Sequence, residues 1–188
     1  MKVGDSGMPE EEYWNSLFDV PHIVDWVAIP PNAVVVEVGC GYGTFTVAVA
    51  QKAAHVYAFD IEPEMIRRTQ AVLRDAGRTN VSLHLRDVLD SGMNLPASSV
   101  DCVLLINILH FNERRVLLEQ AARVLRKGGV VAVVHWRRDI NTPRGPALEL
   151  RPERSTILSA VQGLPLVFDG AEAILPPYHW GMKLTKVD

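Results

Sequence analysis

Several features that mark other classes of protein are scarce or absent in this sequence. It has only two cysteines, Cys40 and Cys102, and both lie inside apolar runs rather than in a spaced pattern of disulfide or zinc ligands. The first residues lack the apolar core of a signal peptide, and no stretch reaches the roughly 18 consecutive apolar residues that a membrane helix needs. We therefore expect a reducing, cytoplasmic compartment and no membrane partner.

An excess of positive charge is also absent. Lysine and arginine number 19 against 22 aspartates and glutamates, which gives a formal net charge of -3. Proteins that track nucleic-acid phosphates are usually strongly basic, so a nucleic-acid partner is not favoured. The 188 residues contain 48% apolar and 22% charged residues, an ordinary globular balance, and we expect residues 1–188 to form one domain.

Strand-like and helix-like segments alternate from residue 34 onward. Buried strands are expected at residues 34–38, 54–59, 81–85, 100–106, 130–135, 166–175 and 178–187, the last two as a hairpin. Helices are expected at residues 44–53, 63–76 and 152–162, and from Asn112 as N-cap to a stop at Gly128 and Gly129. Repeated β-α-β order with right-handed crossovers predicts a doubly wound α/β sheet with helices on both faces.

Two segments outside this alternation are expected to cover a ligand site. Residues 10–26 carry apolar side chains at mixed spacings with Pro21 between them, which predicts two short helices within a lead-in or lid over residues 1–32. Prolines are frequent from residue 143 to residue 177, and residues 136–152 are expected to form a loop over the active site.

The most informative stretch is V-V-V-E-V-G-C-G-Y-G-T-F at residues 34–45, where a buried strand leads into a glycine turn and a helix start. Gly39, Gly41 and Gly43 allow the backbone to turn sharply and to approach a ligand closely. A dinucleotide site of the G-x-G-x-x-G type would have a glycine where this chain has Thr44. The spacing G-x-G-x-G therefore disfavours a nicotinamide dinucleotide.

Two acidic residues narrow the ligand further. Glu37 precedes the first glycine, where a carboxylate would repel a pyrophosphate but could bind an ammonium group directly or through water. Asp60 ends the second expected strand, where a carboxylate in such folds accepts both hydroxyls of a ribose. The ligand is expected to have a ribose and a positive end, and no phosphate.

S-adenosylmethionine meets that description, and here the chain resembles a class I S-adenosylmethionine-dependent methyltransferase of the small bacterial type in the methyltransferase-domain family. The resemblance covers about residues 10–135. It rests on E-V-G-C-G-Y-G as the first motif, D-I-E-P-E-M as the second, R-D-V as the third and V-D-C-V-L-L-I-N-I-L-H as the fourth. It implies a Rossmann-like, mostly parallel seven-stranded sheet with an antiparallel last strand, and S-adenosylhomocysteine as the product.

The same resemblance implies the cofactor contacts. The three glycines would line the methionine part, Asp60 would hold the ribose, and Asp87, unless it only forms a turn, would bond the adenine amine. Tyr13 or Trp14 would close over the cofactor, unless they only pack in the core. The full set of expected cofactor-binding residues is Glu37, Gly39, Cys40, Gly41, Gly43, Asp60, Ile61, Asp87, Val88, Asn107, Tyr13 and Trp14.

Three histidines are the candidate catalytic residues. Methyl transfer from a sulfonium is an in-line displacement that depends mainly on alignment and exclusion of water, so a base is not obligatory. Ligands of open α/β sheets lie at the carboxyl ends of strands, which selects His110, His135 and His179. The resemblance places the last strand beside the fifth, with His179 near His135, and either imidazole could accept a proton unless it is only structural. No ligand pattern accompanies them, so no metal is expected.

The residues after the fourth strand narrow the choice of methyl acceptor. This chain has N-I-L-H there, not the N-P-P-Y-like sequence of adenine-directed enzymes, and no cysteine as in cytosine C5 enzymes. We predict in-line methyl transfer to a small-molecule nucleophile by a monomer or homodimer. The alternatives are a protein-methylating enzyme, a non-catalytic S-adenosylmethionine-binding domain and, less favoured, an NAD-dependent oxidoreductase. An arginine of the loop after strand five could clamp an anionic group of the substrate, or be solvated only.

Overall fold

The computed structural model describes residues 8–188, so residues 1–7 of the expected lead-in lie outside the described part. Seven strands form one sheet in the order β3-β2-β1-β4-β5-β7-β6. Their bounds are β1 Val34–Val38, β2 His55–Asp60, β3 Val81–Leu85, β4 Val100–Ile106, β5 Leu125–Trp136, β6 Leu166–Leu175 and β7 His179–Lys186.

The strand pairing confirms the expected Rossmann-like sheet. The strands from β1 to β5 pair in parallel, whereas β7 is antiparallel to both β5 and β6. In this pairing His135 lies opposite Trp180, and Trp136 lies opposite His179. The last strand therefore sits between the fifth and the sixth, as expected.

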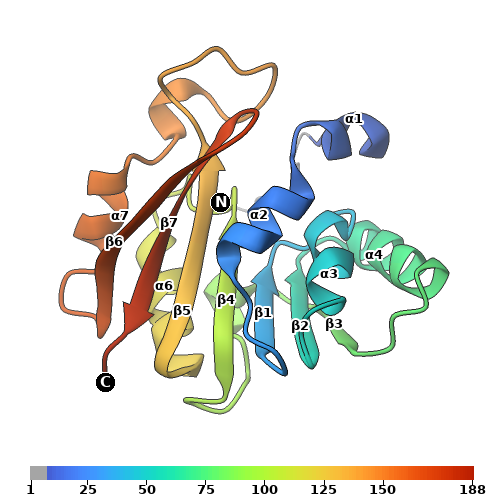
Figure 1. The fold of residues 1–188 in the computed structure, drawn as a ribbon, viewed down its shortest axis with the longest axis horizontal. Coiled ribbons are helices and arrows are strands. Elements are labelled where there is room, and N and C mark those ends of the chain that lie inside the picture. Colours follow the sequence, from blue (N-terminus) through green and yellow to red (C-terminus); the bar gives the residue numbers. More distant parts are fainter. Residues whose placement is uncertain (1–7) are drawn as a thin grey trace.

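Helices cover both faces of the sheet (Figure 1). They are α1 Glu11–Ser16, α2 Val20–Val27, α3 Thr44–Ala50, α4 Pro63–Asp75, α5 Val88–Ser91, α6 Arg114–Val124 and α7 Arg154–Ala160, with a short 3-10 helix, η1, at Leu148–Leu150. One apolar cluster packs α2 and α3 on one face, and a second packs α6 and α7 on the other. Burial on both faces explains why the central strands are almost continuously apolar.

The structure differs from the sequence-based expectation around α6. Glu113, not Asn112, is the N-cap residue, and its side chain makes no capping hydrogen bond. The helix ends at Val124, and β5 begins at once, because buried Leu125 already pairs with Val100. Gly128 and Gly129 therefore lie within β5, beside a register shift in its pairing with β4.

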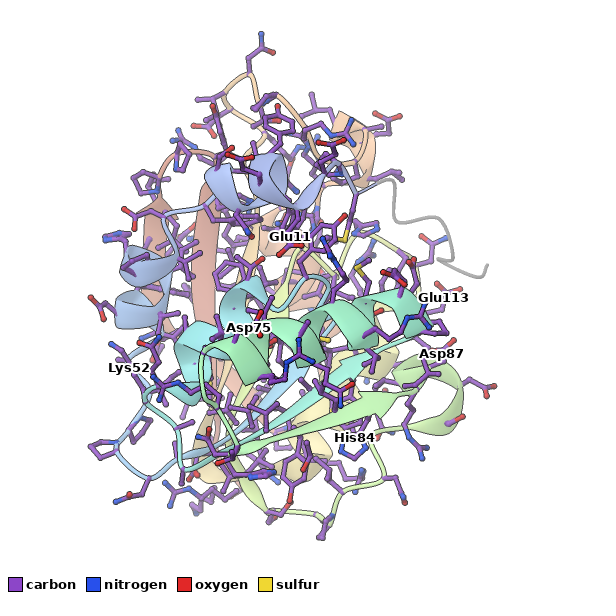
Figure 2. All side chains as sticks on the ribbon, turned by 90° about the vertical axis from the view of Figure 1, so that its right-hand side faces the viewer. Glu11, Lys52, Asp75, His84, Asp87 and Glu113 are labelled. Atoms are coloured by element: carbon purple, nitrogen blue, oxygen red, sulfur yellow. The ribbon has the colours of Figure 1, made fainter. Side chains whose placement is uncertain are left out.

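Two segments lie above the carboxyl ends of the parallel strands: α1 and the loop after β5 (Figure 1). Viewed from the β3 edge, α1 with Glu11 stands above the sheet and His84 lies on β3 below it (Figure 2). No helix within residues 8–188 is long and apolar enough to cross a bilayer.

Candidate functional site

A cavity of about 480 Å³ opens at the carboxyl ends of the parallel strands. Its walls come from the ends of β1, β2, β4 and β5, together with residues before α1 and residues of the loop after β5. The neighbours of β1 are β2 on one side and β4 on the other, so strand order reverses at β1, and open α/β sheets bind ligands at such a switch point. The cavity has the size of a small-molecule site.

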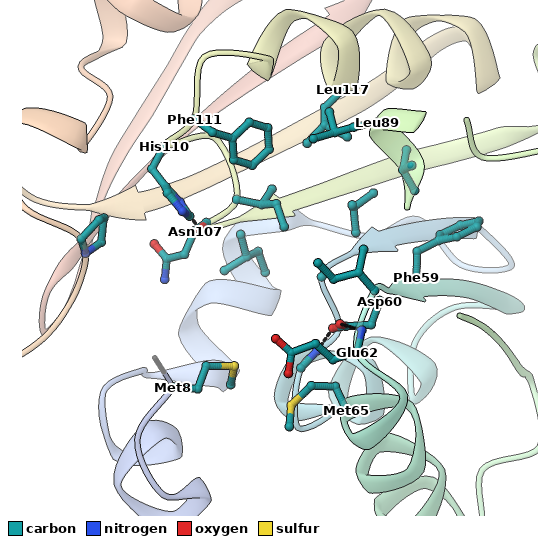
Figure 3. A pocket seen from close by; sticks show the side chains of 18 of the residues that line it. Met8, Phe59, Asp60, Glu62, Met65, Leu89, Asn107, His110, Phe111 and Leu117 are labelled. Carbon is teal, nitrogen blue, oxygen red and sulfur yellow. Dashed lines mark hydrogen bonds between the residues drawn. The ribbon is translucent and has the colours of Figure 1, made fainter. Parts of the chain in front are cut away.

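Asp60, at the end of β2, is fixed by two backbone amides at one end of the cavity. Gly41 N–H donates to Oδ2 at 2.8 Å, and Glu62 N–H donates to Oδ1 at 3.0 Å. Each carboxylate oxygen keeps a further lone pair, so both can still accept from hydroxyl groups. The two amides orient the carboxylate for a vicinal diol such as that of a ribose (Figure 3).

The residues of the glycine loop have two different roles. Gly39 and Gly41 line the cavity, whereas Gly43 and Cys40 do not. Gly43 is the N-cap of α3 with a φ of 82°, and a Cβ there would lie 3.1 Å from Cγ2 of Thr69 on α4. Gly43 thus lets α3 and α4 pack closely, and buried Cys40 receives a hydrogen bond from the Thr69 hydroxyl at 3.6 Å.

Glu37 is buried beneath the loop and does not line the cavity. The Thr46 hydroxyl donates to its Oε2 at 2.6 Å. Burial raises the pKa of Glu37 to about 8, the Thr46 hydrogen bond opposes this, and the charge of Asp60 adds to it. At neutral pH this acid therefore holds its proton.

Asp87 and Val88 line the cavity beyond Asp60. Asp87 is also the N-cap of α5, and its Oδ1 accepts from Leu89 N–H at 2.9 Å. The turn-forming and ligand-facing roles are therefore compatible. With Glu62, the carboxylates of Asp60 and Asp87 outnumber Arg86 and make this end of the cavity acidic, and Ile61 adds an apolar surface.

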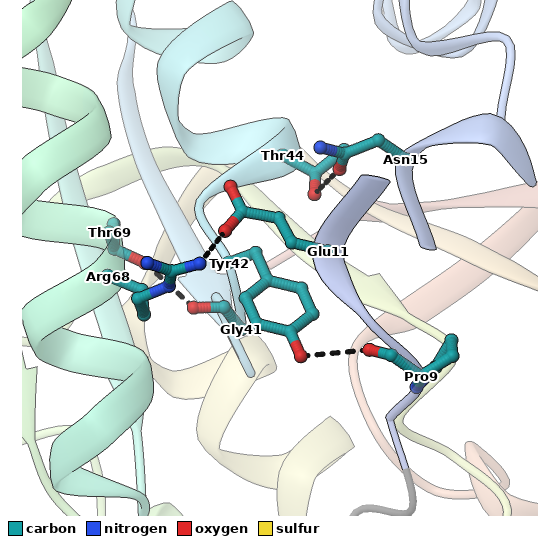
Figure 4. A network of polar contacts seen from close by, with 8 residues as sticks. All are labelled: Pro9, Glu11, Asn15, Gly41, Tyr42, Thr44, Arg68 and Thr69. Carbon is teal, nitrogen blue, oxygen red and sulfur yellow. Dashed lines mark hydrogen bonds and ion pairs between the residues drawn. The ribbon is translucent and has the colours of Figure 1, made fainter. Parts of the chain in front are cut away.

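Three polar contacts join the segment that contains α1 to the glycine loop, to the start of α3 and to α4 (Figure 4). The Tyr42 hydroxyl donates to Pro9 O at 2.9 Å, Thr44 Oγ1 donates to Asn15 Oδ1 at 2.6 Å, and Arg68 pairs with Glu11 at 2.6 Å. No residue of α1 is buried. Trp14 lines the cavity, as do Met8 and Pro9, whereas Tyr13 is 43% exposed and does not.

The opposite end of the cavity holds Asn107 and His110 (Figure 3). His110 Nδ1 lies 3.1 Å from the backbone oxygen of Asn107. A carbonyl only accepts, so Nδ1 carries the proton and Nε2 keeps its lone pair. Burial lowers the pKa of His110, the Asn107 carbonyl opposes this and the charge of Arg114 adds to it, so the ring is neutral near pH 7.

His135 and His179 are fully buried and do not line the cavity. His179 is stacked on Phe18 at 4.5 Å between ring centres, and its Nε2 lies 3.1 Å from Nδ2 of Asn107. Burial lowers its pKa to about 3 and holds the pKa of His135 well below the ordinary value. Both rings are therefore neutral. Within residues 8–188, no group of three possible ligands is arranged to hold a metal ion.

Sequence patterns did not identify several residues of the cavity wall. They are Met8, Pro9, Phe111, Trp136, Gly145 and Pro146. None of them belongs to a recognisable motif, because they reach the cavity through the approach of segments distant in the chain. The signal that was available, the proline-rich stretch after residue 136, indicated the loop but not its contacts.

The comparisons with known proteins agree with this geometry. Residues 35–129 match a family described as "Methyltransferase domain". An uncharacterized protein of Mycobacterium tuberculosis H37Rv is 30% identical over 142 residues, which are 73% of this chain and 49% of that protein. A protein named "Methyltransferase" from Claviceps purpurea is 35% identical over 96 residues, 51% of this chain and 29% of that one.

The fold is also that of a known structure. A SAM-dependent methyltransferase from Aquifex aeolicus superposes with a TM-score of 0.81 at 20% identity, over 97% of this chain and 96% of that one. The chain therefore belongs to the methyltransferase-domain family, as a class I S-adenosylmethionine-dependent methyltransferase domain. It spans about half the length of the M. tuberculosis relative.

The residues of the cavity fit the cofactor of this family. The carboxylates at the Asp60 end complement a ligand with a ribose and a positive charge, and the glycine loop leaves the backbone exposed beside it. Membership of the family decides against the NAD-dependent alternative.

Proposed function

We propose that this protein transfers a methyl group from S-adenosylmethionine to a small-molecule nucleophile by in-line displacement. The observation that carries the proposal is the cavity that joins the Asp60 end to the His110 end. Because α1 and the loop after β5 both contribute to its wall, the acceptor end suits a small molecule better than an extended polypeptide.

The residues of the chain would hold and orient the reactants. Asp60 would accept hydrogen bonds from the ribose hydroxyls. Asp87 and Ile61 would lie beside the adenine, and Gly39 and Gly41 would lie beside the methionine part. When bound, the cofactor supplies an electrophilic methyl group on a sulfonium. Glu37 supports this end as a neutral acid that can ionise when a positive charge lies near.

His110 is the residue placed to accept a proton from the acceptor. It lines the cavity, its ring is neutral near pH 7, and its Nε2 lone pair is left available by the Nδ1 hydrogen bond. Asn107 positions His110 through its backbone carbonyl. His179 contacts Asn107 and not the cavity, and His135 lies behind the cavity wall.

The proposal is tested by incubating the protein with labelled S-adenosylmethionine and a panel of small phenols, amines and thiols, with a protein extract in parallel. Mass spectrometry should identify a methylated small molecule, with formation of S-adenosylhomocysteine. Label found only in polypeptide would replace the proposal with protein methylation. Cofactor binding without any methylated product would support a non-catalytic domain.

A further inference from the structure

Arg151 lies beneath the part of the loop that lines the acceptor end of the cavity. Only 8% of the residue is exposed. Its Nε donates to Pro146 O at 2.9 Å, Nη1 donates to Arg137 O at 2.7 Å, and Nη2 donates to Arg144 O at 3.3 Å. Its Cζ also lies 6.0 Å from the centre of the Trp136 ring. The guanidinium therefore fixes the course of the loop.

The charge of Arg151 has no counter-ion among residues 8–188. The nearby guanidiniums of Arg137 and Arg138 pair with Asp139 and Glu153, but no carboxylate lies within ion-pair distance of Arg151. Burial and then the charge of Arg138 lower its pKa, although a guanidinium stays protonated at neutral pH. A buried charge that is not paired is costly, and carbonyl dipoles do not cancel it.

One glycine separates this charge from the cavity. Gly145 lines the cavity with a φ of 113°, and a Cβ there would lie 3.1 Å from Nη2 of Arg151 and 3.0 Å from the Trp136 ring. Only glycine allows the backbone to pass this close to both groups. The field of the guanidinium therefore reaches the cavity through a single layer of backbone.

The peptide between Arg144 and Gly145 adds to this field. Its carbonyl points at Arg151, and in a trans peptide the N–H points the opposite way. The N–H of Gly145 therefore faces away from the guanidinium, and no acceptor within the described part of the chain is bonded to it. A positive charge and an oriented amide together form the kind of surface that binds anions.

The two ends of the cavity thus differ in charge. At the cofactor end the three acids Asp60, Glu62 and Asp87 outnumber Arg86. The acceptor end has the neutral ring of His110, Arg144 in the cavity wall and, behind Gly145, the charge of Arg151. We propose that the methyl acceptor is a small molecule with a carboxylate near its nucleophilic atom, and that the Gly145 peptide backed by Arg151 binds this carboxylate. The inference rests on the proposed function, since it assigns the acceptor of the same cavity.

Calorimetry on the protein saturated with S-adenosylhomocysteine tests it without turnover. Sodium benzoate and benzamide have the same shape and differ in charge. The wild type should bind benzoate at least about tenfold more tightly, because charge-assisted hydrogen bonds exceed neutral ones by this order. Arg151→Met should lose the preference and Arg151→Lys should keep part of it. Arg154→Met, which removes a guanidinium paired with Glu172, should keep the preference.

Tryptic cleavage after Arg138 and Arg144 reports whether the loop holds its place in each variant. Equal binding of benzoate and benzamide by the wild type overturns the inference, as does a preference that survives in Arg151→Met or disappears in Arg154→Met. If Arg151→Met does not fold, the preference for benzoate over benzamide in the wild type and in Arg151→Lys still tests the inference. Failure of S-adenosylhomocysteine to bind at all would instead refute the proposed function, so the two failures are distinguishable.

Discussion

His110 Nδ1 lies 3.1 Å from the backbone oxygen of Asn107, and this one contact sets which nitrogen of the ring can accept a proton. Asn107 has a φ of 55°, a left-handed conformation that is uncommon for a side-chain-bearing residue. Its amide in turn lies beside His179 Nε2. The end of β4 is therefore held from two sides, and His110 takes its orientation from the main chain.

Replacing His110 tests its role in the reaction. His110→Asn should lower kcat by about 100-fold or more, the usual contribution of a general base, and leave the affinity for S-adenosylhomocysteine unchanged. His22→Asn, a change at an exposed position of α2, serves as the control. If His110→Asn turned over an identified acceptor at the wild-type rate, His110 would not be the general base.

The pH dependence of turnover should follow the same ring. The neutral form of His110 is the active one and its pKa is lowered, so kcat should be constant above pH 6.5 and fall as the pH drops below the lowered pKa. Steady-state rates with saturating substrates measure this limb. If His110→Asn shows the same fall in kcat at low pH, the fall belongs to another titrating group.

The contacts that join the α1 segment to the glycine loop and to α4 should control exchange of the cofactor product. Tyr42→Phe with Arg68→Met removes one hydrogen bond and one exposed ion pair, together worth about 1 to 2 kcal/mol. Dissociation of S-adenosylhomocysteine in a stopped-flow displacement should then be roughly tenfold faster. Arg67→Met breaks an ion pair on the same helix that does not involve α1, and should have no effect.

The buried histidines should make the protein sensitive to acid. His179 has a native pKa of about 3, against about 6.5 in an unfolded chain, so the unfolded state binds more protons between these values. The contribution of such a histidine to the free energy of unfolding is fully present above pH 6.5. It falls as the pH drops through this window, by up to about 1.4 kcal/mol per pH unit for each such histidine. His179→Gln should reduce that slope in urea titrations between pH 6.5 and pH 4.5. An unaltered slope would show that His179 is protonated in the native state.

Glu37 should act in the opposite direction. Its native pKa of about 8 lies above the value of 4.5 for a free side chain, so the folded state holds the extra proton. Its contribution to stability is complete below pH 4.5 and is lost as the pH rises toward 8. The free energy of unfolding of Glu37→Gln, relative to that of the wild type, should be higher at pH 8 than at pH 5. Chemical unfolding at both pH values measures this difference.

The parts of the fold that depend on local pattern could be predicted from the sequence. The apolar run before Gly39 and the acid at Asp60 indicated the cofactor end, and both residues line the cavity. The end of α6 could not be placed correctly, because Gly128 and Gly129 are typical helix stops, whereas pairing of Leu125 with β4 ends the helix earlier. At the end of α6, a contact between distant parts of the chain outweighs the local preference of the glycines.

The acceptor end was predicted less well for a related reason. The three histidines all lie near strand ends in the sequence, yet only His110 lines the cavity. His135 and His179 lie within strands and are fully buried. The position of Arg151 under Gly145 depends on how a long loop folds back on itself. Spacing in the sequence carries no information about that.

The most direct test of the account is calorimetric titration of the protein with S-adenosylmethionine, S-adenosylhomocysteine and NADH, with Asp60→Ala as the matched variant. We expect micromolar binding of both sulfur ligands, no binding of NADH, and affinities at least about 100-fold weaker in Asp60→Ala, since two hydrogen bonds to a carboxylate are lost. Equal affinity of the wild type and Asp60→Ala, or a preference for NADH, would contradict it.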